Sequence, residues 1–157
     1  MACNGVLVYC NWNSGDLDWK LQKVIKHTSG VSYPRDEEII REATKEMDEY
    51  FRGEREIFQV PFELYGTEFQ KKVWTELGRV TYGTTLSYKE ISIQCGLMKG
   101  MRAVASACGA NPLAIIIPCH RIVGADGSIG GYTGGVDKKN KLLEHEFLHE
   151  IQKKFGG

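Results

Sequence analysis

The fold is organised around the segment IIIPCHRIV, residues 115–123, where a dense apolar run ends at a proline that is followed directly by a thiol and an imidazole. Short apolar runs are typical of buried strands, and proline cannot donate a hydrogen bond to a sheet. We therefore predict a buried strand over residues 115–117, which ends at Pro118 and holds Cys119 at the end of a rigid element.

Cys119 and His120 are the first candidates for chemistry. The thiolate is the nucleophilic form of cysteine, so Cys119 needs a base that removes its proton. Neighbouring side chains of an extended strand point to opposite faces, so cooperation with His120 requires either a turn of the backbone or a bridging water molecule. The same residue types also fit an inert buried thiol and a satisfied core histidine.

The composition bounds the class of protein. The 157 residues, 42% apolar and 25% charged, suffice for one or two small domains with a core. No apolar stretch approaches the roughly 20 residues of a membrane span, and the first residues lack a targeting pattern. We expect no membrane partner and a cytoplasmic location, or a nuclear one in a eukaryote. The five cysteines lack a CxxC pair, which favours reduced thiols over disulfides or a common zinc site.

The formal net charge is zero, but the charges are unevenly distributed. Residues 31–56 contain nine acids and five bases, whereas residues 69–123 contain seven bases and two acids. The zero total argues against strong binding of nucleic acid. The basic second half could nevertheless meet phosphates, or it could be a solvated surface with scattered lysines.

Alternating apolar residues predict a strand over residues 6–12, followed by a turn at residues 14–16. Residues 17–26 fit a strand or a helix equally well. Residues 36–51 predict an amphipathic helix closed by Gly53. Its apolar stripe consists of Ile39, Ile40, Ala43, Met47, Tyr50 and Phe51.

Residues 55–61 are expected to form a short strand or a linker. We place a domain boundary at its end, which gives an N-terminal domain of residues 1–62 and a second domain of residues 63–157.

The second domain begins with helical signals. Capping boxes at residues 67–70 and 87–90 predict two helices, which end at Gly78 and Gly96. A third helix is predicted over residues 99–108. The buried stripe of the first helix is Phe69, Val73, Trp74 and Leu77, and that of the third is Met101, Val104, Ala105 and Cys108.

The second and third of these helices form a helix-turn-helix pattern, and the third is rich in small residues. Such a pair could be ordinary core packing or a DNA-reading element. An exposed Arg102 has the charge and length to enter a groove, although most surface arginines are merely solvated.

A glycine-rich loop at residues 130–135 would allow close backbone approach to a ligand. The last helix, residues 137–153, is predicted to bury Leu142, Leu143, Phe147 and Ile151, which turns Glu146 toward the apolar side. A buried carboxylate needs a partner, and we expect a relay in which Glu146 orients His120 and His120 takes the proton of Cys119.

PCHRIV at residues 118–123 resembles the PCHR(V/I)V active-site signature of the O6-alkylguanine-DNA alkyltransferases, also called methylated-DNA–protein-cysteine methyltransferases. The likeness covers about residues 54–147, while the first fifty residues match only loosely. Further motifs follow in order: GTEFQ at 66–70, VW at 73–74, TYG at 81–83, SY at 87–88, RAV at 102–104, NP at 111–112, GYTGG at 131–135 and LLEHE at 142–146.

The resemblance implies a fold in which a small α/β domain, a sheet plus helix of the ribonuclease H-like kind, precedes a mainly α winged helix-turn-helix domain with the DNA-binding and active sites. It implies DNA repair by irreversible, single-turnover transfer of the alkyl group from O6-alkylguanine, and from O4-alkylthymine, to Cys119. The base is flipped out of double-stranded DNA, because a fixed thiol cannot reach it within the duplex. No cofactor is implied, and we expect a monomer.

The resemblance also implies roles for single residues. The catalytic set is Cys119, His120, Glu146, Tyr88 and Asn111. Arg102 would fill the gap left by the flipped base and Tyr88 would press on the target phosphate. The remaining DNA-binding residues would be Ala103, Ser106, Thr67 and Gln70, and the base pocket would comprise Cys119, Ile122, Tyr132, Thr133 and Lys139.

The chain departs from the family at Ala105, Ser106 and Thr133, which could narrow the pocket or the approach to the groove. Some members bind a structural zinc near the N-terminus, but Cys3, Cys10 and His27 lack a standard spacing, so we predict no metal site. Two other functions stay open. One is a non-catalytic helix-turn-helix lesion sensor or transcription regulator, and the other is a cysteine hydrolase.

Overall fold

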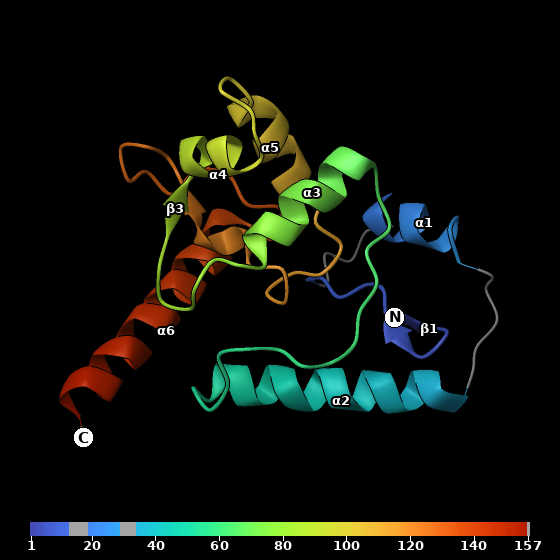
Figure 1. The fold of residues 1–157 in the computed structure, drawn as a ribbon. Coiled ribbons are helices and arrows are strands. Elements are labelled where there is room, and N and C mark those ends of the chain that lie inside the picture. The colour runs from blue at the N-terminus through green and yellow to red at the C-terminus, as the bar shows by residue number, and fades with distance from the viewer. Residues whose placement is uncertain (13–18, 29–33, 157) are drawn as a thin grey trace.

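The path of the chain in the computed structural model, which describes residues 1–12, 19–28 and 34–156, is shown in Figure 1. The turn expected at residues 14–16 and the start of the segment 17–26 lie outside the described residues. The elements are β1 (Ala2–Cys3), β2 (Val6–Leu7), α1 (Trp19–Ile25), α2 (Pro34–Phe51), α3 (Glu68–Leu77), β3 (Leu86–Ser87), α4 (Tyr88–Gln94), α5 (Met101–Gly109), the 3₁₀ turn η1 (Cys119–Arg121), β4 (Ile122–Val123) and α6 (Val136–Phe155).

The N-terminal strands form an antiparallel hairpin whose turn, Asn4–Gly5, has positive φ at both residues. Two-residue turns of this kind match the twist of paired strands. The strand predicted over residues 6–12 is confirmed only at Val6–Leu7, because beyond it Cys10 makes a single bridge to Leu113 and no longer ladder forms there. The ambiguous segment before residue 26 is a helix, α1.

Helix α2 confirms the prediction for residues 36–51, and Gly53 follows it with a φ of 74°. Ile40 and Phe51, expected in the buried stripe, are 45% and 47% exposed. Two carboxylates are buried instead. Asp36 accepts a hydrogen bond from the amide of Gly5, and Glu46 accepts from the amides of residues 59 and 60. Helix α2 therefore holds the β1–β2 turn and the segment that follows α2 by their backbones.

Helices α3, α4 and α5 pack against one another, and both predicted capping boxes are present. The indole of Trp74 donates to the carbonyl of Ala107, which joins α3 to α5. The buried face of α5 differs from the prediction, because Val104, Ala107 and Cys108 are buried whereas Met101 and Ala105 are exposed. Only the face toward α3 and α4 is covered, and both of these residues lie outside it.

The apolar run at residues 115–117 is not a strand, and this prediction was wrong. Ala114 and Ile117 bridge each other across a tight turn in which Ile115 has a φ of 70°. All three isoleucines are nevertheless buried. The side chain of Asn111 replaces a strand partner, since it accepts from the amide of Leu113 and donates to the carbonyl of Ile117.

Helix α6 confirms the predicted last helix and extends away from the rest of the chain toward the C-terminus (Figure 1). Leu142 is buried and Leu143 is half-buried, but Phe147 and Ile151, which we expected to be buried, are 59% and 37% exposed. The core contacts only the side of α6 that carries Leu142 and Glu146. Among the described residues, no helix combines the length and apolarity required to span a membrane.

Candidate active site

Cys119 is the first residue of η1, directly after Pro118. Its amide donates to the carbonyl of Ile117 at 2.8 Å, and the amide of Arg121 donates to that of Pro118 at 3.0 Å. The backbone therefore turns between the thiol and the imidazole, which is one of the two alternatives that the sequence left open.

The thiol is buried, and Asn111 holds it. The Nδ2 atom of Asn111 lies 3.2 Å from Sγ of Cys119 and 2.8 Å from the carbonyl oxygen of Ile117. The amide thus fixes the turn and gives the sulfur a hydrogen-bond donor. Burial raises the pKa of Cys119, while the hydrogen bond from Asn111 and the charges of Lys20 and Lys139 act in the opposite direction. Lys20 on α1 lies beside this group, with Nζ 3.4 Å from the carbonyl oxygen of Asn111.

His120 is fully buried, and its Nε2 lies 2.7 Å from Oε1 of Glu146. Burial lowers the pKa of His120, although the neighbouring carboxylate favours the charged form. A neutral ring whose Nε2–H donates to Glu146 leaves a lone pair on Nδ1. That atom is buried and has no hydrogen-bond partner among the described residues, so it is available to accept a proton.

Glu146 is the centre of a buried hydrogen-bond network. Besides His120, it accepts hydrogen bonds from the hydroxyl of Tyr50 at 2.8 Å, from Arg121 through Nε and Nη2 at 2.9 Å each, and from the amide of Gly83 at 3.1 Å. Burial alone would raise the pKa of Glu146, but the hydrogen bonds from His120 and Arg121 outweigh it and lower the pKa to about 2. The carboxylate is therefore ionised and is held by four residues.

Sequence reasoning missed Tyr50, Arg121 and Gly83 as parts of this network. Tyr50 was counted only as one member of an apolar stripe, and Arg121 and Gly83 were quoted within the PCHRIV and TYG motifs without a role of their own. Arg121 is 5% exposed, and it also donates to the carbonyl of Val80. Its position beside His120 was the one available signal, because a buried guanidinium must be near a carboxylate.

A hollow of about 330 Å³ lies over the thiol. Tyr88 lines it from the start of α4, and Tyr132 and Thr133 line it from the glycine-rich loop; the rest of the lining is Ala105, Cys108, Gly109, Cys119 and Gly131. Burial raises the pKa of Tyr88 to about 12, so its hydroxyl stays protonated. Tyr132 accepts from the indole of Trp12, and Thr133 donates to the carbonyl of Gly109, which ties the loop to α5.

Lys139 and Ile122, which were assigned to the base pocket, lie behind the hollow rather than in its lining. Both side chains are fully buried. The ammonium of Lys139 donates to the carbonyl of Ile122 at 2.5 Å and lies 3.5 Å from that of Gly131, and burial lowers the pKa of Lys139. Lys139 therefore connects β4 with the glycine-rich loop.

The predicted DNA-binding residues fall into two places. Arg102, Ala103 and Ser106 are all exposed on α5, whose small-residue face continues to Ala105 at the rim of the hollow. Thr67 and Gln70 instead use their side chains to cap α3 and line a separate hollow beside α1. The structure does not bring these two residues to the thiol.

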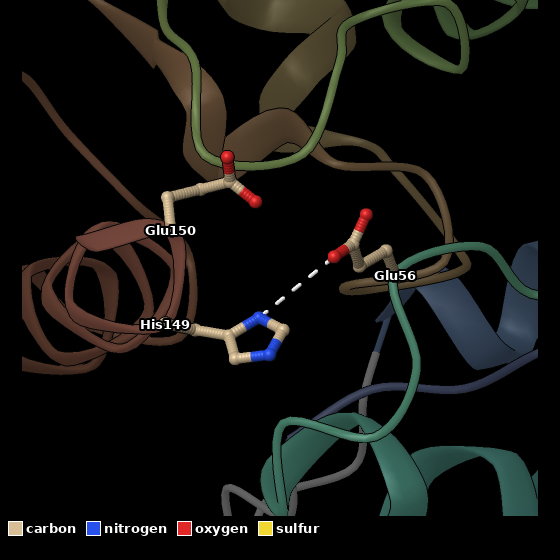
Figure 2. Close-up of side chains that lie close together, drawn as sticks. All are labelled: Glu56, His149 and Glu150. Carbon is tan, nitrogen blue, oxygen red and sulfur yellow. Dashed lines mark ion pairs between the residues drawn. The ribbon is translucent and has the colours of Figure 1, made fainter. Parts of the chain in front are cut away.

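Glu56, His149 and Glu150 form a second group of ionisable side chains, shown in Figure 2. They have the composition of a metal site, and Nδ1 of His149 lies 3.9 Å from Oε1 of Glu56. The ammonium of Lys153, however, donates to both carboxylates at 2.5 and 2.9 Å. The group is therefore an ion-pair network that links the segment after α2 to α6.

A family model described as 6-O-methylguanine DNA methyltransferase, DNA binding domain, matches residues 68–147. This range begins with α3 and ends one residue after Glu146. A methylated-DNA–protein-cysteine methyltransferase of Methanosarcina acetivorans is 46% identical over 115 residues, which cover 73% of this chain and 74% of that protein. The chain belongs to the O6-methylguanine-DNA methyltransferase family.

Solved structures of the O6-methylguanine-DNA methyltransferase family agree with this assignment. Mycobacterium tuberculosis OGT in complex with DNA matches with 46% identity and a TM-score of 0.68 over 69% of this chain and 68% of that one. A variant of the M. tuberculosis O6-methylguanine methyltransferase matches over 91% of this chain and 81% of that one, with 38% identity and a TM-score of 0.74. The family predicted from the motifs is confirmed, and the mixed fold of helices with small sheets is consistent with these relatives.

Proposed function

We propose that this chain repairs DNA by moving the alkyl group of O6-alkylguanine onto Cys119, once per molecule. The observation that carries the proposal is the position of the thiol. It lies at the hollow between α4, α5 and the glycine-rich loop, with Asn111 on its sulfur and the pair of His120 and Glu146 beside it. Relatives named methylated-DNA–protein-cysteine methyltransferases support the same activity.

The transfer is a displacement at the alkyl carbon. The proton of Cys119 passes to Nδ1 of His120, directly or through a water molecule, and Glu146 stabilises the imidazolium that results. The S–C bond forms as the C–O6 bond breaks, and guanine leaves with the bonding electron pair. Tyr88 can donate a proton to the leaving guanine, because its raised pKa keeps the hydroxyl protonated in the hollow.

Burial raises the pKa of the thiol, so transfer depends on the base beside it rather than on a preformed thiolate. Burial also lowers the pKa of His120, which keeps Nδ1 unprotonated at neutral pH. The thioether formed has no proton to lose and no leaving group that water displaces readily, which accounts for a single turnover without a cofactor.

We propose that α4 and α5 act as a helix-turn-helix, with the β3–β4 pair and the following loop as a wing, within a domain of residues 63–157. In support, α4 packs on α5, and β3 pairs in parallel with β4. Residues 1–62, with the β1–β2 hairpin and α2, would form the N-terminal domain, of the ribonuclease H-like kind. Arg102, Ala103 and Ser106 would face the minor groove, where small side chains allow close approach.

Double-stranded DNA that contains O6-alkylguanine is the proposed substrate, with O4-alkylthymine as a second one. The hollow of about 330 Å³ supports the flipping of a base, because it has the size and aromatic lining that a single base requires. A cytoplasmic location, or a nuclear one in a eukaryote, follows from this substrate.

The test is the intact mass of the protein after incubation with a duplex that contains one O6-methylguanine. We expect a gain of one methylene group per chain, located on the peptide that contains Cys119, and no gain for Cys119→Ser. A chain that binds the duplex without gaining mass would be a lesion sensor. Repeated turnover on an ester or peptide substrate would instead indicate a hydrolase.

The flipping role of Arg102 has its own test. Arg102→Ala should slow transfer from duplex DNA more than transfer from the free O6-alkylguanine base, because only the duplex has a gap to fill. Equal losses on both substrates would remove this role.

A further inference from the structure

Two buried polar atoms at the cluster of Glu56, His149 and Glu150 have no hydrogen-bond partner. Among the described residues, three buried side-chain nitrogen or oxygen atoms lack one: Nδ1 of His120, Nδ1 of His149 and the hydroxyl of Tyr82. The first of these is the proposed base of the active site. The other two lie at the cluster. An unpaired buried polar atom is costly, so two at one place indicate a site where a further group binds.

Tyr82 belongs to the cluster through its contact with His149. The two rings pack edge to face, with centroids 5.6 Å apart and an angle of 88° between them. Tyr82 is 6% exposed, and it lines the same hollow as Glu56. Burial first, and then the neighbouring carboxylates, Glu56 and Glu150 among them, raise the pKa of Tyr82 to about 12. The hydroxyl therefore stays protonated and can donate a hydrogen bond.

The three side chains of the cluster converge from two segments of the chain, as Figure 2 shows. Glu56 comes from the segment after α2, and His149 and Glu150 come from α6. One ligand atom of each residue lies within 4.8 Å of the others, and Nδ1 of His149 lies 3.9 Å from Oε1 of Glu56. Ligand atoms of a tetrahedral zinc site lie about 3.4 Å apart. Small rotations of the two glutamates would therefore close the group around an ion.

We propose that Glu56, Nδ1 of His149 and Glu150 bind one Zn²⁺, with Tyr82 as hydrogen-bond donor to a ligand carboxylate or to a water molecule on the metal. The sequence led us to expect no metal site, because these ligands lie far apart along the chain and form no motif. Two carboxylates and one imidazole are a ligand set that zinc accepts, and the imidazole favours zinc over magnesium. Hydrogen bonds to the ligand carboxylates are a regular part of such sites.

Lys153 shows that this position attracts a cation. Its ammonium donates to Glu56 at 2.5 Å and to Glu150 at 2.9 Å, so it draws the two carboxylates together. The side chain of Lys153 is 47% exposed, and its flexible stem lets the ammonium move into water when a metal takes the carboxylates. These ion pairs involve neither Nδ1 of His149 nor the hydroxyl of Tyr82. A metal ion accounts for both.

The proposed site has an entry path and is separate from the thiol. A depression of about 570 Å³ is lined by residues 53–57 and 59 and by His149 and Lys153. Zinc at this place would join the segment after α2 to α6. The proposal does not depend on the transfer reaction, because Cys119 lines a different hollow.

The experiment is isothermal titration of the full, EDTA-treated chain with zinc chloride, without DNA. We expect one zinc ion per chain at this site. His149→Ala and Glu150→Gln should each weaken binding by more than about a hundredfold, beyond what the loss of an outer hydrogen-bond partner costs. His27→Ala and Glu144→Gln, both at exposed positions, are the matched controls and should leave binding unchanged. A chain that binds no zinc, or ligand variants that bind it like wild type, would overturn the proposal.

Two further variants distinguish a metal site from a purely structural ion-pair network. Lys153→Ala should strengthen zinc binding about tenfold, because it removes a competing cation from both carboxylates. Tyr82→Phe should weaken it about tenfold, because it removes the hydrogen bond to the ligands. Circular dichroism verifies that every variant is folded. Weaker binding by Lys153→Ala, or unchanged binding by Tyr82→Phe, would contradict this arrangement.

X-ray absorption at the zinc edge identifies the ligands directly. We expect nitrogen and oxygen ligands at about 2.0–2.2 Å and no sulfur at about 2.3 Å. A sulfur ligand would place the zinc on a cysteine and would refute the site.

Discussion

Replacing Glu146 by glutamine removes the charge on which the active-site network is centred. The pKa of Glu146 is lowered from 4.5 to about 2, and each unit corresponds to about 1.4 kcal/mol, so the ionised carboxylate contributes about 3 kcal/mol to the free energy of unfolding. Leaving Arg121 buried without its counter-charge is expected to cost about 3–5 kcal/mol. The two estimates agree in size. We therefore expect Glu146→Gln to lower the free energy of unfolding by about 3 kcal/mol at pH 7.

The pH dependence gives this prediction a second readout. Because the pKa of Glu146 is lower in the folded chain, its stabilisation is complete above about pH 4.5 and is lost as the pH falls toward about 2. The difference in stability between wild type and Glu146→Gln should therefore shrink by about 1 kcal/mol between about pH 5.5 and 3.5.

Urea unfolding of both proteins at these pH values measures the difference directly. Glu42→Gln, an exposed position on α2, is the matched control and should change stability by less than about 0.5 kcal/mol. If Glu146→Gln were as stable as wild type at pH 7, or if the difference between the two proteins did not vary with pH, the ionised network could not be what holds this site together.

Three further changes have defined outcomes. Asn111→Ala removes the hydrogen-bond donor to the Cys119 sulfur and to the turn beside it. It should slow single-turnover transfer at least tenfold and lower the free energy of unfolding by about 1–3 kcal/mol. An unchanged transfer rate in rapid-quench kinetics would contradict the proposed role of Asn111 at the sulfur. Thr67→Ala breaks a capping box and should lower stability by about 1 kcal/mol in thermal unfolding, while the transfer rate per folded molecule stays constant. Gly83→Ala places a side chain at a φ of 71° and should cost about 1–2 kcal/mol in urea unfolding, and a neutral result would mean that this backbone relaxes.

Much of the helical framework could be predicted from local sequence, because capping residues and apolar spacing act within a few residues of each other. Both capping boxes and the helix starts at Glu68 and Tyr88 are where the pattern placed them. The apolar run at residues 115–117 shows the limit of this reasoning. Burial accounts for its composition equally well in a strand and in a turn, and the side chain of Asn111 selects the turn.

The candidate site was likewise predictable only in part from the sequence. The pairing of His120 with Glu146 could be predicted, because the position of the carboxylate follows from the pattern of the last helix and a buried charge requires a partner. Tyr50 could not be predicted as a further partner of Glu146, since 96 residues separate the two side chains and Tyr50 fitted the apolar stripe of its own helix. Thr67 and Gln70 are the opposite case. The resemblance assigned them to DNA binding, but in the structure their side chains cap α3.

The sequence by itself determined the family, the candidate nucleophile and every helix except α1, because these depend on residue identity and on spacing along the chain. Only the tertiary structure decided which side of each helix is covered. Phe147 and Ile151 have the spacing of core residues, yet they lie outside the core, because burial depends on the elements that pack against a face. Tertiary structure also decided that Arg121, Tyr50 and Gly83 converge on Glu146, since hydrogen bonds between distant segments leave no period in the sequence.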